Sequence, residues 1–156
     1  MKFSLWTQYG ALNSKPVFDA FRYSLLQAGH SVVENNLDSD VEVIWSVLWQ
    51  GRMKGNEAIW RRARAAGKPV IVLEVGSIQR GITWKVGLNG INRDAYFGSK
   101  GNLDTRAKQL SLHLADWRTN ENGSILICAQ HSHSEQWHNM PSVSNWVIQT
   151  IDTIRQ

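Results

Sequence analysis

Two carboxylates stand where this chain could carry out proton transfer. Glu74 interrupts the apolar segment 70–75 near its end, and Asp94 lies in a stretch rich in glycine and asparagine. A carboxylate within an apolar strand is costly unless it is paired or faces a cleft. In a cleft, such a group can serve as a general base. Glu74 and Asp94 are therefore the candidate catalytic residues. The alternative for Glu74 is an ion pair with a neighbouring cation, such as Arg80 or Lys85.

Cationic and amide side chains surround these carboxylates in the sequence. Segments 79–81 and 89–94 combine glycine with arginine and asparagine. Glycine lets a backbone approach a ligand closely, and arginine can grip a phosphate with two hydrogen bonds. The alternative is ordinary turn chemistry, in which asparagine and aspartate bond to their own backbone. The candidate binding residues here are Arg80, Lys85, Asn89 and Arg93.

A polar loop follows the first predicted strand and enters a helix. It has neither the G-x-G-x-x-G pattern nor a P-loop pattern, so no dinucleotide or NTPase motif is present. We interpret it as a substrate loop, with an ordinary strand-to-helix turn as the alternative. Its candidate residues are Gln8, Tyr9, Gly10, Asn13 and Ser14.

Histidines gather in a second polar loop, 130–140, which holds His131, His133, His138 and Glu135. The spacing of these histidines has no strong metal-ligand pattern, so we predict no metal site and no cofactor. Contact of an anion or a sugar with the loop is the favoured hypothesis, and a solvated loop is the alternative. The candidate residues are Gln130, His131 and Trp137.

The elements that must position these groups alternate between apolar strands and amphipathic helices. This alternation predicts an α/β fold of the Rossmann-like kind, a mostly parallel sheet with helices on both faces. In such a sheet, ligands bind beyond the carboxyl ends of the strands, which are followed here by loops 8–14, 49–55, 75–81 and 130–140. The expected strands are 2–8, 31–35, 41–49, 70–75, a strand within 82–88, and 124–130, and the expected helices are 15–28, 56–66, 103–116 and 142–155.

The polar segment 119–123 predicts a boundary between a first domain, 1–118, and a second part, 119–156. The second part buries too little to fold alone. The apolar face of the last helix is therefore expected to pack on the first domain, or on a second copy of the chain. This face is formed by Val143, Trp146, Val147 and Ile151.

Composition narrows the classes of protein. The chain has 156 residues, of which 42% are hydrophobic and 19% charged, so it can bury a core. It has no apolar run long enough to span a membrane and no signal peptide, which predicts a cytoplasmic protein without a membrane partner. The single cysteine, Cys128, is expected to be a buried core thiol.

A net charge of +4 and eight tryptophans favour an anionic, sugar or nucleic-acid partner. The basic helix face that could contact a phosphate backbone, or remain solvated, consists of Arg61, Arg62, Arg64 and Lys68.

Segments 6–14, 43–49, 70–76 and 87–94 resemble uncharacterised glycosyltransferase-like proteins of marine phages and metagenomes, over the whole chain. The resemblance implies the N-terminal, acceptor-side half of a GT-B architecture, with two Rossmann-like domains and a cleft between them. Segment 124–135 would open the second, donor-binding domain. The Arg-Pro-His-Pro-like motif that follows the last helix in those proteins does not occur here.

The implied reaction is transfer of a sugar from a nucleotide-sugar to the hydroxyl of a glycan or a modified DNA base. Glu74 or Asp94 would act as the base, Arg80 and Arg93 would hold anionic groups, and no metal would be needed. The alternative is a non-catalytic module that binds a nucleotide or a nucleic acid. A hydrolase is disfavoured because the chain lacks a G-x-S-x-G motif.

Overall fold

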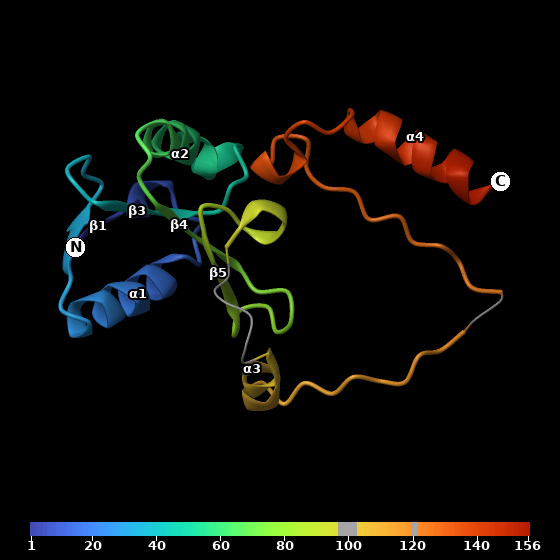
Figure 1. Ribbon diagram of the computed structural model, residues 1–156, viewed down its shortest axis with the longest axis horizontal. Coiled ribbons are helices and arrows are strands. Elements are labelled where there is room, and N and C mark those ends of the chain that lie inside the picture. Colours follow the sequence, from blue (N-terminus) through green and yellow to red (C-terminus); the bar gives the residue numbers. More distant parts are fainter. Residues whose placement is uncertain (97–102, 120–121) are drawn as a thin grey trace. The chain divides into compact units, whose positions relative to one another are not determined.

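The computed structural model describes residues 1–96, 103–119 and 122–156 (Figure 1). Its centre is a five-stranded sheet with the strand order β2-β1-β3-β4-β5. The first four strands are parallel, and β5 runs antiparallel to β4. The expectation of a mixed α/β fold with a mostly parallel sheet is therefore confirmed. The strands are β1 (Lys2–Leu5), β2 (Ser31–Glu34), β3 (Val41–Trp45), β4 (Val70–Val75) and β5 (Trp84–Leu88).

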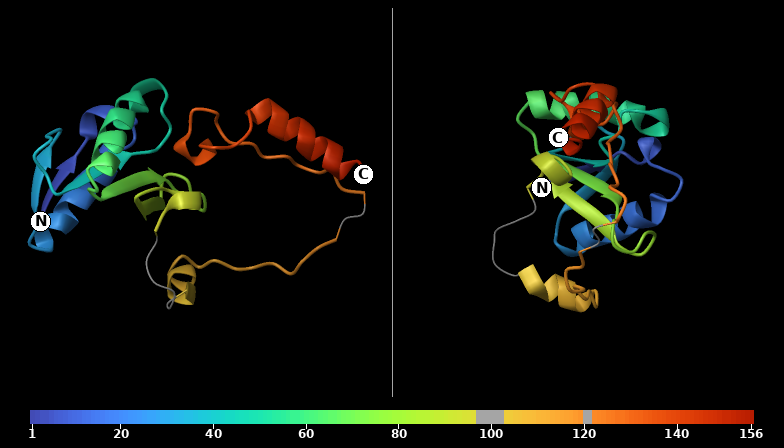
Figure 2. Two further views of the ribbon diagram at one scale, coloured as in Figure 1. Left: turned by 45° about the horizontal axis from the view of Figure 1, so that its top comes forward. Right: turned by 90° about the vertical axis from the view of Figure 1, so that its right-hand side faces the viewer.

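Two helices cover opposite faces of this sheet (Figures 1 and 2). Helix α1 (Lys15–Gln27) buries Phe18 and Leu25 against side chains of one face. Helix α2 (Asn56–Ala65) packs Ile59 and Trp60 against the other face. Alternate residues of β3 belong to the two cores, which is why the whole strand is buried and its sequence is nearly all apolar.

The direction of β5 follows from the length of the connection before it. Residues 76–83 join β4 to β5 without a helix. Parallel strands need a crossover of about a dozen residues or more, so this short connection permits only a hairpin. Gly76 makes the hairpin tight, since a Cβ atom placed there would lie 2.0 Å from the carbonyl oxygen of Thr83.

The first and third strands are shorter than expected. β1 ends at Leu5 rather than at residue 8, because Thr7–Tyr9 form a turn of 3-10 helix, η1. β3 ends at Trp45 rather than at residue 49, because Ser46 takes a positive φ of 65° that no strand can accommodate. Both departures place additional loop residues at the carboxyl edge of the sheet.

Between residues 103 and 130, one predicted helix is shorter than expected and one predicted strand is absent. Helix α3 spans Leu103–Gln109 instead of running to 116, and the apolar side chains beyond it are exposed, Leu114 to 100% and Trp117 to 90%. Residues 124–130 form no strand, and the thiol of Cys128 is exposed rather than buried. Apolar residues form a strand only where another strand pairs with them, and segment 124–130 pairs with none in the described residues.

The chain divides into two units, Met1–Phe97 with Gln130–Gln156, and Gly98–Ala129. The last helix of the first unit is α4 (Val143–Ile154). Ser142 caps its N-terminus, since the Ser142 hydroxyl accepts a hydrogen bond from the backbone N–H of Asn145. None of the residues of α4 is buried. Packing of its apolar face, and the domain boundary near residue 119, stay predictions. None of the helices in the described ranges is long and apolar enough to cross a membrane.

Candidate functional site

A pocket of about 530 Å³ lies at the carboxyl edge of the parallel strands. Trp45 and Ser46 line it from the end of β3, and Val75 and Gly76 line it from the end of β4. This is where a parallel sheet places its strand-to-helix loops. The candidate residues that the structure brings together here are Asn13, Glu74, Lys85, Arg80, Gln130 and His131.

Glu74 occupies the inner wall of this pocket. It pairs in the β4–β5 register with Lys85, so the two side chains project from the same face of the sheet. One carboxylate oxygen, Oε1, accepts a hydrogen bond of 2.7 Å from the backbone N–H of Val75. No ion pair of Glu74 occurs within the described part of the chain. The carboxylate is therefore half-buried, oriented by one bond and open to a ligand.

Two cations share the pocket with this carboxylate. Arg80 is exposed and forms no ion pair among the described residues. Lys85 donates a hydrogen bond of 3.2 Å from Nζ to Oδ1 of Asn92, a neutral acceptor. The pocket thus holds two positive charges against one negative charge, which favours an anionic ligand.

Segment 130–137 closes the pocket from a distant part of the sequence. The backbone N–H of Trp49 donates to the carbonyl of His133 at 3.0 Å, and that of Glu135 donates to Val47 at 2.9 Å. The indole N–H of Trp49 donates to Oε2 of Glu135 at 2.8 Å. These bonds attach the segment to the loop after β3, which explains how Gln130 and His131 reach the pocket.

The first loop contributes less to this pocket than expected. Of its candidates only Asn13 lines it. Tyr9 stacks on Trp6, with ring planes 9° apart, and Gly10 and Ser14 are buried against α1, where the Ser14 hydroxyl donates to Ala11. Gln8 is exposed. This loop therefore joins β1 to α1 mainly by packing.

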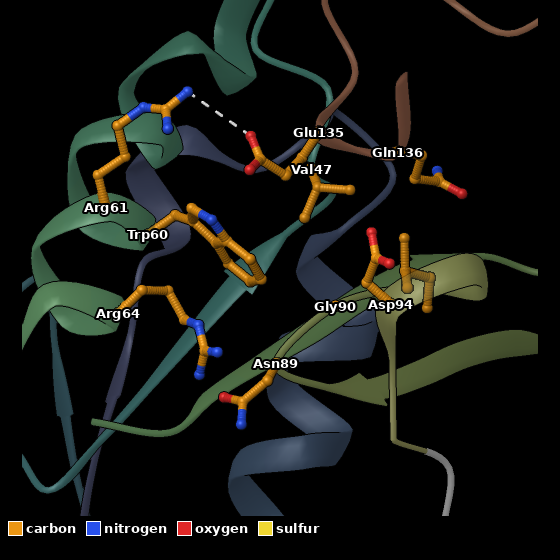
Figure 3. A pocket seen from close by; sticks show the side chains of 10 residues that line it. Val47, Trp60, Arg61, Arg64, Asn89, Gly90, Asp94, Glu135 and Gln136 are labelled. Atoms are coloured by element: carbon orange, nitrogen blue, oxygen red, sulfur yellow. Dashed lines mark ion pairs between the residues drawn. The ribbon is translucent and has the colours of Figure 1, made fainter. Parts of the chain in front are cut away.

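Four other candidates lie away from this pocket. Asn89 and Asp94 line a second pocket beside α2 (Figure 3). Arg93 donates from Nη2 to the carbonyl of His138 at 3.1 Å. The indole N–H of Trp137 donates to the carbonyl of Pro141. Glu74 and Asp94, the two base candidates, therefore do not share one site.

Several lining residues were not selected from the sequence. Ser46, Ser134 and Gln136 all line the carboxyl-edge pocket. The signal for Ser46 was present, since it is the single polar residue within the apolar run 43–49. Nothing in the sequence distinguished Ser134 and Gln136 from their polar neighbours, because their position depends on the docking of segment 130–137.

The basic face of α2 is largely engaged within the protein. Arg61 pairs with Glu57 and Glu135, and Arg62 pairs with the buried Glu42. Lys68 donates to the carbonyl of Ser39. These contacts leave little unpaired charge on this face for a phosphate backbone. Where the structure describes the chain, no group of three His, Cys, Asp or Glu side chains could hold a metal ion.

Comparisons with known protein families, with curated proteins and with solved structures found no match to the chain. The fold and the pocket at the carboxyl edge of the sheet are therefore the features from which a function can be argued.

Proposed function

We propose that this chain is the acceptor-side, N-terminal part of a GT-B-like glycosyltransferase, which moves a sugar from a nucleotide-sugar to an acceptor hydroxyl. The order β2-β1-β3-β4 of the parallel strands supports a Rossmann-like interpretation. Along the chain, β2 is added on one side of β1, and β3 and β4 are added on the other side. The order of strand addition therefore switches between β1 and β3. The carboxyl-edge pocket borders this point, since Asn13 lines it from the loop after β1 and Ser46 lines it from the end of β3. Open α/β sheets commonly bind ligands at such a point.

The observation that carries the proposal is that Glu74, which has no ion-pair partner among the described residues, shares its pocket with two cations. Glu74 would accept the proton of the acceptor hydroxyl as its oxygen attacks the anomeric carbon of the sugar. The bond between that carbon and the phosphate oxygen breaks, and its electron pair leaves with the nucleoside diphosphate. Arg80 and Lys85 would stabilise the negative charge that develops there.

The position of segment 130–137 favours a ligand that contacts both this segment and the loops at the strand ends. Gln130 and His131 line the pocket together with residues from the strand ends, such as Ser46. A sugar or a phosphate in this position would contact both. The proposed location is the cytoplasm, or the host cytoplasm for a phage protein, where nucleotide-sugars are available as co-substrates.

A non-catalytic nucleotide-binding module is the second candidate, because Arg80 and Lys85 would bind phosphate equally well without any reaction. The same pocket would then hold a nucleotide, and Glu74 would be dispensable. Binding of nucleic acid receives less support, since Arg61 and Arg62 of α2, and Lys68 after it, are engaged with groups of the protein itself.

The test is to incubate the chain with a panel of nucleotide-sugars and generic acceptors. Binding is followed by NMR of the protein, and release of nucleoside diphosphate by phosphorus NMR. We expect Arg80→Gln to weaken binding, and Glu74→Gln to retain binding but lose release. Binding without release in the native chain, unaffected by Glu74→Gln, would favour the binding module. Failure of every nucleotide-sugar to bind would overturn the proposal, and an added arm with duplex DNA tests the nucleic-acid alternative.

A further inference from the structure

A second pocket, of about 430 Å³, lies beside α2 and shares only Gln136 with the carboxyl-edge pocket. Its walls come from α2, from the turn after β5 and from segment 130–137 (Figure 3). Val47, Trp60 and Ile91 form its apolar part. A volume of this size suits a small molecule.

The charges in this pocket are paired, with one exception. Arg61 lies 3.6 Å from Glu135, which also accepts a hydrogen bond from Trp49. The Asp94 carboxylate accepts a hydrogen bond of 3.3 Å from Nε of Arg93. Of the charged side chains that line the pocket, only Arg64 has no ion-pair partner within the described residues. Arg64 is thus the charged group of this pocket whose guanidinium is available to pair with a ligand.

The amide of Asn89 adds a neutral donor to this charge. Its Oδ1 accepts a hydrogen bond of 2.9 Å from the backbone N–H of Val70, which fixes the orientation of the amide. The Nδ2 group has no partner in the described residues. Asn89 is held further by its own backbone N–H, which donates to the carbonyl of Val70 at 2.6 Å. The donor is therefore preorganised.

The amide of Gln136 is oriented by a similar argument. Lys85 can only donate, so Oδ1 of Asn92 faces Lys85 and Nδ2 of Asn92 faces Gln136. Oε1 of Gln136 is then occupied as the acceptor, at 2.7 Å. Its Nε2 group, again a donor, has no partner where the structure describes the chain. The unused amide groups of this pocket are therefore donors, whereas both amide oxygens are occupied.

The guanidinium of Arg64 is also held in place. It lies over the indole ring of Trp60, 5.9 Å from the ring centre and four residues further along α2. This contact positions the charge beside the ring, and the N–H edge of the guanidinium has no hydrogen-bond partner among the described residues. That edge matches a carboxylate or a phosphate with two parallel hydrogen bonds.

We infer that this second pocket binds a small molecule carrying an oxyanion, either a carboxylate or a phosphate monoester. Arg64 holds the oxyanion, and the Asn89 amide supplies a further hydrogen bond to it. Val47 and Trp60 contact the apolar body of the ligand. This site is independent of the proposed glycosyl transfer, because Glu74, Arg80 and Lys85 do not line it.

The experiment is an NMR titration of the whole chain with phenyl phosphate and, separately, with phenylacetate. Benzyl alcohol, which has the ring but no charge, is the control ligand. We expect saturable shifts of the Trp60 indole N–H, the Asn89 amide and the Arg64 Nε–H with one or both anions. Benzyl alcohol at the same concentration should leave them unchanged. The comparison of the two anions identifies which oxyanion the site takes.

Two variants locate the binding. Arg64→Gln should weaken it by about tenfold or more, the scale for losing a charge-assisted hydrogen bond. Arg64→Lys keeps the positive charge but cannot form two parallel hydrogen bonds, so its affinity should lie between those of the native chain and Arg64→Gln. Arg80→Gln, in the other pocket, should leave the affinity unchanged. The inference is overturned if neither anion shifts these resonances, if Arg64→Gln binds as tightly as the native chain, or if Arg80→Gln abolishes the binding.

Discussion

Glu74 and Lys85 lie directly opposite each other on the antiparallel strands β4 and β5, and both line the carboxyl-edge pocket. Glu74 is held by the backbone N–H of Val75, while Lys85 is turned towards Asn92. A carboxylate and an ammonium group are thus presented side by side, but each is oriented by a neutral neighbour. A ligand can meet both charges, which a closed ion pair would not allow.

The two base candidates can be separated by one pair of variants. Glu74→Gln should reduce glycosyl transfer by about 10²-fold or more, the usual scale for losing a general base. Asp94→Asn should have little effect, because Asp94 lines the other pocket. Both variants should unfold at the native denaturant midpoint, since neither carboxylate is buried. Initial rates of nucleoside diphosphate release provide the measurement. Equal losses in the two variants would contradict the assignment of Glu74.

Glu135 is expected to hold segment 130–137 in place. Glu135→Ala removes the acceptor for the Trp49 indole N–H and a partner of Arg61. Hydrogen exchange of that indole N–H should accelerate by about tenfold, as expected for loss of a partly buried charged hydrogen bond. Glu57→Ala, which removes the other partner of Arg61, is the matched control and should leave the exchange rate close to native. An unchanged rate in Glu135→Ala would show that backbone bonds alone hold the segment.

The buried carboxylate of Glu42 should make Arg62 important for stability. Glu42 is fully buried and is bound by Nη2 of Arg62 at 3.1 Å and by the Trp6 indole N–H at 2.7 Å. Arg62→Ala leaves this charge without a cation and should cost about 2 kcal/mol, less than for a fully buried pair because Arg62 is partly exposed. Arg61→Ala, one residue earlier on α2, should cost within about 1 kcal/mol. The measurement is the free energy of unfolding of the two variants in urea. Equal losses of stability in both variants would contradict the importance of the Arg62–Glu42 pair.

The Lys2–Asp38 pair should make a small contribution to stability that depends on pH. The hydrogen bond and the positive charge of Lys2 hold the pKa of Asp38 below its ordinary value of 3.8. Because the folded pKa is lowered, the ionised carboxylate stabilises the fold above pH 3.8, and this contribution is lost as the pH falls through the folded pKa. The difference in unfolding free energy between the native chain and Asp38→Asn should therefore shrink on acidification.

Salt and a second variant check this interpretation. The pair is exposed, so added salt at neutral pH should reduce the same difference. Lys2→Met removes the other partner and should show the same pH dependence as Asp38→Asn. A difference that stays constant from neutral to acidic pH would contradict the contribution of this pair.

Local sequence patterns were sufficient for the elements that make up the core. The helical spacing of Phe18 and Leu25, and of Ile59 and Ala63, predicted α1 and α2 to within a residue or two at each end. The apolar run of β3 predicted an inner parallel strand. Parallel strands then place their following loops at one edge, which is why Glu74 and Arg80 could be expected together.

Tertiary contacts decided what these patterns left open. Ser46 ends β3 inside an apolar run. Asp94 and Glu74 line different pockets, because the turn after β5 lines the pocket beside α2. Segment 124–130 has the composition of a strand but no strand to pair with among the described residues. The sequence by itself determined which segments favour helix or strand, since propensity and periodicity act over a few residues. Only the tertiary structure decided where strands stop, which way β5 runs and which polar groups meet, because those outcomes depend on neighbours far away in the chain.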